Sequence, residues 1–416
     1  MNKRLIQCLT LLVVLMLATG TPVVAQPADG PVGTPGNGGG GPGGGGPGGG
    51  GPGGGGGGGG GKSKVDHKAA QNLPIQLGTS GGNENDWVSD GLFVSCSSGT
   101  LGALLTDTGG NLFILSNTHV FVRDPQQAAY LAESVGQPGL IDANCAPSNT
   151  LPVGTLASGS SMATTTTGPP PNNYPRPDSN VDAAVASTSS TEVMADGSIL
   201  GIGAISNQVM TPVEALGQPV TKSGRTTGNT SSTVDGINAT ISVGYSAPLG
   251  GGSGFTREFT GQILVKNRRN KFLNSGDSGS LAVHGETLQP VGLLYAGSSS
   301  IAVANPAQDV LDYFVYSAGR VSGASGDLSF VGGPPVGSAS STQSASVARA
   351  VEVQQANAAR LRSVPRGVGH AVSSQNGVGV IKVLVEEITP ETRQAVPTQL
   401  DGVPVVLEAV GRIVAY

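Results

Sequence analysis

The chain has 416 residues, of which 37% are hydrophobic and only 12% are charged, and its formal net charge is −5 at pH 7. This length allows one large domain or two modest ones. The charge is not basic enough to suggest nucleic acid as a partner, and the abundance of Ser, Thr, Gly and Val favours a mainly β protein.

The N-terminal residues have the pattern of a secretory signal peptide. Lys3 and Arg4 precede an apolar stretch over residues 5–18, and a small-residue cleavage site follows at residues 23–25. We therefore expect residues 1–25 to be removed and the mature protein to be secreted, in an extracellular or periplasmic location. An uncleaved N-terminal anchor is the alternative.

Two segments of low complexity divide the rest of the chain. Residues 26–72 are rich in Gly and Pro and offer few side chains to bury, which predicts a disordered spacer. Residues 322–346 are rich in Gly, Ser and Pro and are predicted to be a linker. Two folded parts are therefore expected, over residues 73–321 and 347–416.

The first folded part contains many short apolar runs separated by turn residues. This pattern is typical of a β-sandwich or of β-barrels. Gly109-Gly110 lies between two of the runs and is expected to form a hairpin turn. The main runs cover residues 92–94, 101–105, 112–115, 181–186, 198–202, 220–222, 237–243, 261–265, 281–283 and 291–295. A helix is predicted over residues 307–314, where Pro306 favours a helix start.

The second folded part has a different composition. Residues 347–361 are rich in Ala, Gln and Arg and are predicted to be helical, and a second helix is expected to begin at Thr389-Pro390. Strands are predicted over residues 378–385 and 403–410. This part is interpreted as a separate small α/β module of about 70 residues, near the lower limit for independent folding.

Three cysteines occur, and Cys8 would leave with the signal peptide. Cys96 and Cys145 remain, and an even pair in an exported chain predicts one disulfide. A metal site is not expected, because the two cysteines are far apart and no His or Cys partners lie nearby. No metal or organic cofactor is predicted.

The pentapeptide Gly276-Asp277-Ser278-Gly279-Ser280 places a serine in a glycine turn behind an aspartate. Small flanking residues allow a tight turn that exposes the hydroxyl and directs backbone N–H groups at one point. A serine hydroxyl becomes a nucleophile only when a base accepts its proton and donors stabilise the oxyanion. The same five residues could equally be a structural turn.

His119 and Asp182 are the candidate partners of this serine. His119 lies where an apolar strand gives way to a turn, a place from which a rigid sheet can position a base. Asp182 is the one carboxylate in an otherwise apolar segment, and a hydrogen bond from an imidazole Nδ1–H would satisfy it. Taken singly, His119 could be a structural sheet-edge histidine and Asp182 a strand-end cap.

The chain order His119, Asp182, Ser278 with a GDSGS serine resembles the chymotrypsin/trypsin-like serine proteases. Residues 222–228 (KSGRTTG) resemble the start of the second barrel in bacterial members such as α-lytic protease and the streptogrisins, and residues 292–297 (GLLYAG) resemble the strand that lines the substrate groove. Two further stretches, Ser-Asn-Thr-His at 116–119 and the segment over 137–145, are most similar to the branch that includes the plant narrow-leaf proteases.

This resemblance covers about residues 75–320 and implies a fold and a set of roles. It implies two six-stranded antiparallel β-barrels, divided near residues 200–215, with the site in the cleft between them. Ser278 would attack the scissile carbonyl, His119 would act as base and then acid, and Asp182 would orient the imidazole. The N–H groups of Gly276 and Ser278 would form the oxyanion hole. The substrates would be proteins or peptides.

The sequence departs from the family pattern in two places. His119 is followed by Val120 instead of Cys, so the local disulfide of the family is absent, and Cys96–Cys145 would bracket the histidine more widely. A processed Ile-Val-Gly-Gly N-terminus that would pair with Asp277 is also absent. The resemblance to bacterial members makes Arg225 the expected cation for Asp277, which is buried in this fold and needs one.

Other functions stay open at this point. A catalytically silent trypsin-fold binding or adhesion protein is the main alternative, whereas an α/β-hydrolase is disfavoured because its nucleophile motif is G-x-S-x-G and its histidine follows the serine. The C-terminal module could inhibit or assist folding as a pro-region, dock substrates, or cap the fold, and intramolecular regulation is among its expected roles. No acid occurs in residues 272–275, so the primary pocket is expected to prefer a small or apolar side chain over Lys or Arg.

Overall fold

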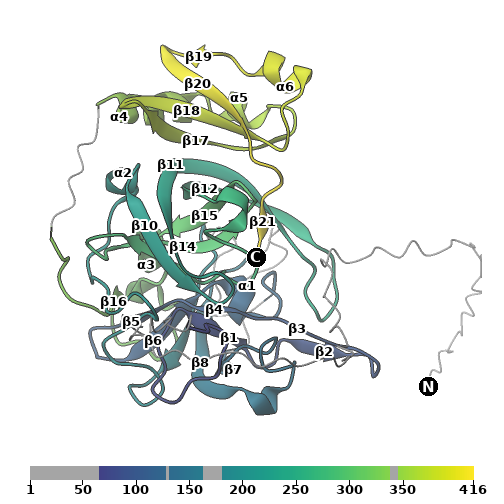
Figure 1. The fold of residues 1–416 in the computed structure, drawn as a ribbon, viewed down its shortest axis with the longest axis vertical. Helices are drawn as coiled ribbons and strands as arrows, with labels where there is room; N and C mark the ends of the chain where they lie inside the picture. The colour runs from purple at the N-terminus through teal and green to yellow at the C-terminus, as the bar shows by residue number, and fades with distance from the viewer. Residues whose placement is uncertain (1–64, 128–130, 163–179, 338–344) are drawn as a thin grey trace, which may run out of the picture. The chain divides into compact units, whose positions relative to one another are not determined.

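The computed structural model describes residues 65–127, 131–162, 180–337 and 345–416. The predicted signal peptide and most of the glycine-rich spacer lie outside these residues. The described residues belong to one compact unit built mainly of β-strands (Figure 1). Within the described ranges, no helix combines the length and the apolar character needed to cross a membrane.

The first sheet closes into a six-stranded antiparallel barrel. Its strands are β1 (Thr79–Asn83), β4 (Gly99–Leu101), β5 (Ala103–Thr106), β6 (Leu112–Ser116), β7 (Ser134–Gln137), β8 (Leu151–Gly159) and β9 (Ala184–Thr188). The sheet runs β5-β6-β9-β8-β7-β1-β4. Only Gly102 separates β4 from β5, so these two are halves of one bent strand and the sheet returns to its beginning.

The second sheet contains a barrel with the same strand order. Its strands are β10 (Pro219–Gly224), β11 (Gly228–Tyr245), β12 (Phe255–Lys266), β13 (Leu281–His284), β14 (Pro290–Gly297) and β15 (Ile301–Pro306). The order is β10-β11-β12-β15-β14-β13, and β13 pairs back to β10. In both barrels the strands follow the order first, second, third, sixth, fifth, fourth. The predicted pair of six-stranded barrels is therefore confirmed.

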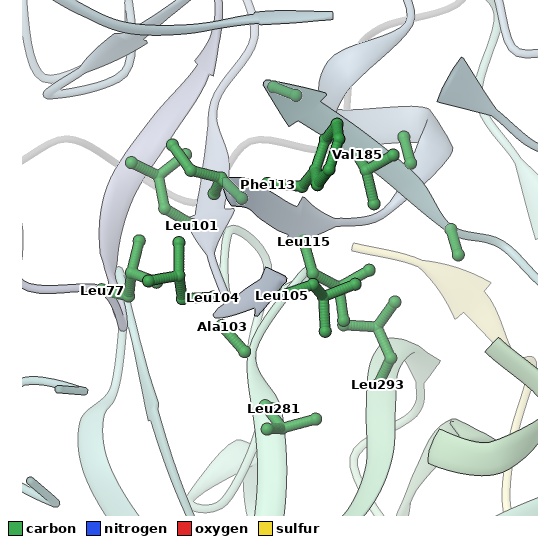
Figure 2. Packing of buried hydrophobic residues seen from close by; sticks show 14 of the residues in the cluster. Leu77, Leu101, Ala103, Leu104, Leu105, Phe113, Leu115, Val185, Leu281 and Leu293 are labelled. Atoms are coloured by element: carbon green, nitrogen blue, oxygen red, sulfur yellow. The ribbon is translucent and has the colours of Figure 1, made fainter. Parts of the chain in front are cut away.

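The hydrophobic core of the first barrel continues into the second. Leu281 of β13 and Leu293 of β14 belong to the same buried cluster as the inward-facing residues of the first barrel (Figure 2). Burying one such leucine contributes about 1.5–3 kcal/mol. The first-barrel members shown are Leu77, Leu101, Ala103, Leu104, Leu105, Phe113, Leu115 and Val185. This shared core holds the two barrels together and fixes the cleft between them.

Shorter elements connect and flank the barrels. They are the hairpin β2 (Trp87–Ser89) and β3 (Val94–Cys96), the helices α1 (Thr118–Phe121), α2 (Pro212–Ala215) and α3 (Ala307–Tyr313), and the 3₁₀ turns η1 (Pro147–Asn149), η2 (Arg268–Asn270) and η3 (Tyr316–Ala318). Helix α2 begins with a capping box in which Thr211 and Glu214 each accept a hydrogen bond from the other's backbone N–H. The predicted helix over 307–314 corresponds to α3.

Two predicted boundaries are wrong. Within the expected linker, β16 (Ser329–Phe330) pairs with β5, and Phe330 is buried in the first-barrel core. At the other end, ordered residues begin before Leu73, and His67 is 7% exposed where a disordered spacer was expected. In each case one buried ring in a polar context, Phe330 or the His67 imidazole, marks the folded residues, which composition alone does not reveal.

The C-terminal part is an α/β unit, as predicted. It contains α4 (Ala345–Ala356), α5 (Ala358–Arg362), β17 (Gly367–Gln375), β18 (Val378–Val385), α6 (Pro390–Ala395), β19 (Gln399–Leu400) and β20 (Val403–Ala409). β17 and β18 form an antiparallel hairpin and β20 runs parallel to β18, so the three lie side by side (Figure 1). β17 also pairs with β11, which makes the unit a continuation of the second-barrel sheet instead of a separate module.

The last strand leaves this unit and returns to the barrel. β21 (Val414–Ala415) pairs in parallel with β11 and antiparallel with β14. Its partners on β14 are Ala296 and Gly297, which belong to the segment whose sequence resembles a substrate-groove strand. The C-terminal part therefore contributes residues to the cleft itself.

Candidate active site

The structure brings His119 and Asp182 together. β6 ends at Ser116 and α1 begins at Thr118, so His119 lies in the short helix that directly follows a rigid strand. Its Nδ1 lies 2.6 Å from Oδ2 of Asp182, which is fully buried. Oδ1 of the same carboxylate accepts a hydrogen bond from the backbone N–H of Thr118 at 2.8 Å. The carboxylate is thus fixed by the same turn that carries the imidazole.

Tyr245, at the end of β11, adds a contact to this pair that the sequence did not indicate. Its hydroxyl donates a hydrogen bond to Oδ2 of Asp182 at 2.9 Å. Its ring meets the His119 ring edge-on, with 5.9 Å between the ring centroids, and stacks on Phe255 at 4.8 Å. Because Tyr245 belongs to the second barrel, it links that barrel to the His119–Asp182 pair.

The pKa of His119 is raised above its ordinary value of 6.5. Burial acts to lower this pKa, but the charge and hydrogen bond of Asp182 and the backbone carbonyl of Tyr416 together raise it by more. His119 Nε2 lies 3.0 Å from the Tyr416 carbonyl oxygen. Both ring nitrogens therefore face acceptors, and the arrangement favours the imidazolium form, in which both carry a proton.

Ser278 lies in the predicted tight turn. Gly276 and Gly279 have φ values of +91° and +92°, a region that residues with side chains rarely adopt. A Cβ atom at Gly279 would lie 2.2 Å from the Thr100 carbonyl oxygen, so glycine is required there for space as well. The Ser278 hydroxyl donates a hydrogen bond to the Tyr295 carbonyl at 3.1 Å.

The four backbone N–H groups of the serine turn from Gly276 to Gly279 differ in their hydrogen bonding. Asp277 and Gly279 donate their N–H groups to the carbonyls of Asn274 and Leu294. Among the described residues, the N–H groups of Gly276 and Ser278 have no hydrogen-bond acceptor. These are the two donors predicted to form an oxyanion hole, and they are available for that purpose.

The serine and the histidine are connected through Tyr416 and do not contact each other directly. Tyr295 O accepts hydrogen bonds from the Ser278 hydroxyl and, at 3.3 Å, from the Tyr416 N–H. The Tyr416 carbonyl in turn lies against His119 Nε2. Asp182 and Ser278 are thus fully buried, His119 is partly exposed, and Tyr416 links the serine to the histidine.

The expected pairing of Arg225 with Asp277 is wrong. The buried cation is Lys222, whose Nζ lies 3.2 Å from Asp277 Oδ2, and both side chains are fully buried. Thr226 and Thr227 donate backbone N–H groups to Oδ1 of Asp277 at 2.8 and 3.0 Å. Burial lowers the pKa of Lys222, and the charge and hydrogen bond of Asp277 oppose that shift.

Strand alternation explains the difference. Lys222 lies two residues after the buried Val220 on β10, so its side chain points to the same inward face. Arg225 follows the end of β10 and directs its guanidinium to Asp142, with two hydrogen bonds of 2.6 and 2.8 Å. It still lies beside the serine turn, because a Cβ atom at Gly276 would be 2.6 Å from its Nη1.

The predicted disulfide is confirmed. Cys96 and Cys145 are bonded, with their Cα atoms 5.6 Å apart. Asp142, three residues before Cys145, accepts the hydrogen bonds of Arg225 and a further one from the Ser80 hydroxyl. The disulfide loop is therefore tied to both barrels at the edge of the cleft.

A cavity of about 320 Å³ opens beside His119. Residues of the disulfide region, of the serine turn and of β21 line it, among them Cys96, Ile141, Tyr245, Ser275, Ala415 and Tyr416. Within the described residues, no three His, Cys, Asp or Glu side chains gather as the ligands of a metal ion would. The other histidines lie elsewhere: His67 contacts Ser223, His284 contacts Thr287 and His370 contacts Gln354.

No protein-family model and no curated protein matches the sequence. Similar solved structures include a glutamic-acid-specific serine protease, which is 16% identical over 62% of this chain and 100% of its own, with a TM-score of 0.34. Thermobifida fusca protease A is 18% identical over 61% of this chain and 98% of its own, with a TM-score of 0.32. A Nocardiopsis protease is 17% identical over 56% of this chain and 94% of its own, with a TM-score of 0.32. These scores are too low to assign an activity, which has to come from the contacts in the cleft.

Proposed function

We propose that the protein is a secreted serine endopeptidase with Ser278 as nucleophile, His119 as general base and Asp182 as its orienting carboxylate. The observation that carries the proposal is the buried His119–Asp182 pair, which is connected through Tyr416 to a serine held in a glycine turn with two unengaged N–H groups. A structural turn would not need a paired histidine in the same cleft or donors without acceptors.

Catalysis would begin when the Ser278 hydroxyl leaves the Tyr295 carbonyl and turns to Nε2 of a neutral His119. His119 accepts the hydroxyl proton as Ser278 attacks the carbonyl carbon, and the Gly276 and Ser278 N–H groups stabilise the oxyanion. One such donor is worth roughly 2.7–4 kcal/mol to the transition state. The imidazolium then donates its proton to the leaving amine, and water releases the acyl group by the same path in reverse.

We also propose that the C-terminal part regulates this activity by occupying the cleft. β21 fills the position between β11 and β14, and the Tyr416 carbonyl lies against the nitrogen that must accept the serine proton. Substrate and β21 cannot both be present. Protein and peptide substrates would therefore bind after the residues from Arg412 to Tyr416 have left the cleft.

An active-site-directed fluorophosphonate tests the endopeptidase proposal against the alternative of a silent binding protein. The full chain and its Tyr416→Gly variant are treated, and the modified residue is identified by mass spectrometry. We expect a covalent adduct on Ser278 that forms faster in the Tyr416→Gly variant. A chain with Ser278→Ala serves as the control. Absence of an adduct from both chains that retain Ser278 would contradict the proposal.

A further inference from the structure

The backbone of residues 414–416 is held as an extended strand along β14. Val414 lies opposite Gly297 and Ala415 opposite Ala296 in an antiparallel register. The Tyr416 N–H donates to the Tyr295 carbonyl at 3.3 Å, so the pairing continues to the last of the three residues. Main-chain hydrogen bonds of this kind accept any sequence, and the side chains determine which sequence fits.

The carbonyl of Tyr416 identifies which residue lies at the reacting position. It is the carbonyl within 3.0 Å of His119 Nε2, and its own N–H binds the same Tyr295 oxygen as the Ser278 hydroxyl. A peptide bound along β14 in the register of residues 414–416 would place the residue that corresponds to Tyr416 next to the serine. The side chain of Tyr416 is therefore in the place of the residue just before a cleaved bond.

The surroundings of the Tyr416 ring are apolar. The ring packs against the second-barrel hydrophobic cluster that contains Phe272, Leu273 and Leu294. It also lies against the backbone of Gly297, since a Cβ atom there would be 3.1 Å from Tyr416 Cε2. Burial raises the pKa of the Tyr416 hydroxyl to about 12, and among the described residues no charged group contributes to that shift.

We propose that residues 414–416 mimic the part of a substrate that precedes the cleaved bond, and that the site prefers Tyr or Phe directly before that bond. This rests on the proposed endopeptidase function. Gly297 is the specificity-determining residue, because the lack of a side chain leaves room for a flat ring over the strand. A ring removes more apolar area from water than Ala, and an ammonium group would lose its hydration without a counter-charge.

Peptide amides test the preference directly. The full chain with Tyr416→Gly, which empties the side-chain position, is assayed on Val-Ala-X peptides that carry a fluorogenic leaving amine, with X as Tyr, Phe, Leu, Ala or Lys. We expect kcat/KM for Tyr and Phe to exceed that for Ala by at least tenfold and that for Lys by about a hundredfold. A preference for Ala or Lys would overturn the inference and leave the endopeptidase function standing.

A different result would reject the endopeptidase proposal itself. If none of the five peptides is cleaved and a Val-Ala-Tyr diphenyl phosphonate leaves Ser278 unmodified, the proposed function fails and the inference with it. A second set of full-chain variants tests the side chain at position 416 with a single peptide substrate. Tyr416→Phe should keep hydrolysis of the Tyr peptide suppressed, whereas Tyr416→Lys should release it as Tyr416→Gly does. Equal suppression by Phe and Lys would overturn the inference.

Discussion

Two fully buried carboxylates, Asp182 and Asp277, belong to different barrels and are stabilised in different ways. Asp182 belongs to the first barrel and pairs with His119, whose side chain is 13% exposed. Asp277 belongs to the second barrel and pairs with Lys222, whose side chain is 0% exposed. Each also accepts backbone N–H hydrogen bonds, Asp182 from Thr118 and Asp277 from Thr226 and Thr227, which follow β10.

The difference lies in what the cationic partner can still do. The Lys222 side chain is fully buried and its ammonium group contacts Asp277 of the serine turn, so this pair holds the turn in place. His119 has one nitrogen committed to Asp182 and one nitrogen free to exchange a proton with whatever occupies the cleft. Burial of a carboxylate thus supports structure in one barrel and, in the proposed function, supports chemistry in the other.

The largest expected effect comes from Asp182→Asn. The amide would keep the size of the side chain but would favour the wrong tautomer of His119, with the proton on Nε2. We expect kcat to fall by about 10⁴. The measurement is hydrolysis of the Tyr peptide in the Tyr416→Gly background, with thermal unfolding as the check on folding. A loss of less than tenfold would mean that His119 does not depend on Asp182.

Lys222→Met should act on stability first. It leaves the Asp277 charge buried without its cation, which costs about 3–5 kcal/mol in the free energy of unfolding. Lys266→Met is the matched control, because Lys266 is 45% exposed and lies 3.7 Å from Asp235. That change should cost less than about 1 kcal/mol. Equal losses in urea unfolding would show that burial of the Lys222 pair has no special weight.

The pH dependence of activity should report on the contact between His119 and Tyr416. The pKa of His119 is raised, so the contact with Tyr416 is fully present below about pH 6.5 and is lost as the pH rises through the raised value. Release of β21 in Tyr416→Gly removes one contribution that raises this pKa. The acidic limb of kcat/KM should therefore move to lower pH than in the full chain. A shift in the opposite direction would contradict this account of the contact.

The smallest expected effect is that of Tyr245→Phe. Loss of the hydroxyl removes one donor from Asp182, for which about 1–2 kcal/mol is typical, or roughly a tenfold loss in kcat/KM. With less of its charge engaged by Tyr245, Asp182 should interact more strongly with His119 and move the acidic limb to higher pH. Tyr313→Phe, at a hydroxyl 3.5 Å from the Gly159 carbonyl, is the control. An unchanged pH profile would reduce Tyr245 to a packing residue.

Much of the fold could be predicted from the sequence because its signals are local. Short apolar runs with turn residues predicted a β-sandwich or β-barrels, and the resemblance of the motifs implied two barrels. The isolated Asp182 in an apolar segment predicted a partner that proves to be His119. The cation that pairs with Asp277 could not be predicted in the same way, since Lys222 and Arg225 lie only three residues apart in the sequence. The choice depends on which face of β10 each side chain takes, and the exact end of a strand is the least reliable part of a sequence-based prediction.

Pairings between distant segments gave no local signal at all. β17 has a mixed sequence with His370 and two serines and was not predicted, yet it pairs with β11 and joins the C-terminal part to the barrel. The position of Tyr416 depends on a two-residue strand between β11 and β14. Such a short segment has no periodicity from which its partner could be inferred.

The pairing of β17 with β11 also affects the tendency of the protein to aggregate. β11 is an 18-residue strand, and β17 covers part of it along residues Ile237 to Ile241, while β10 covers only its first residues. Local opening of the C-terminal part would expose an unpaired edge next to the cleft, and such edges associate with other chains. The same event that frees the cleft of β21 could therefore start aggregation, unless the tail leaves while β17 stays in place.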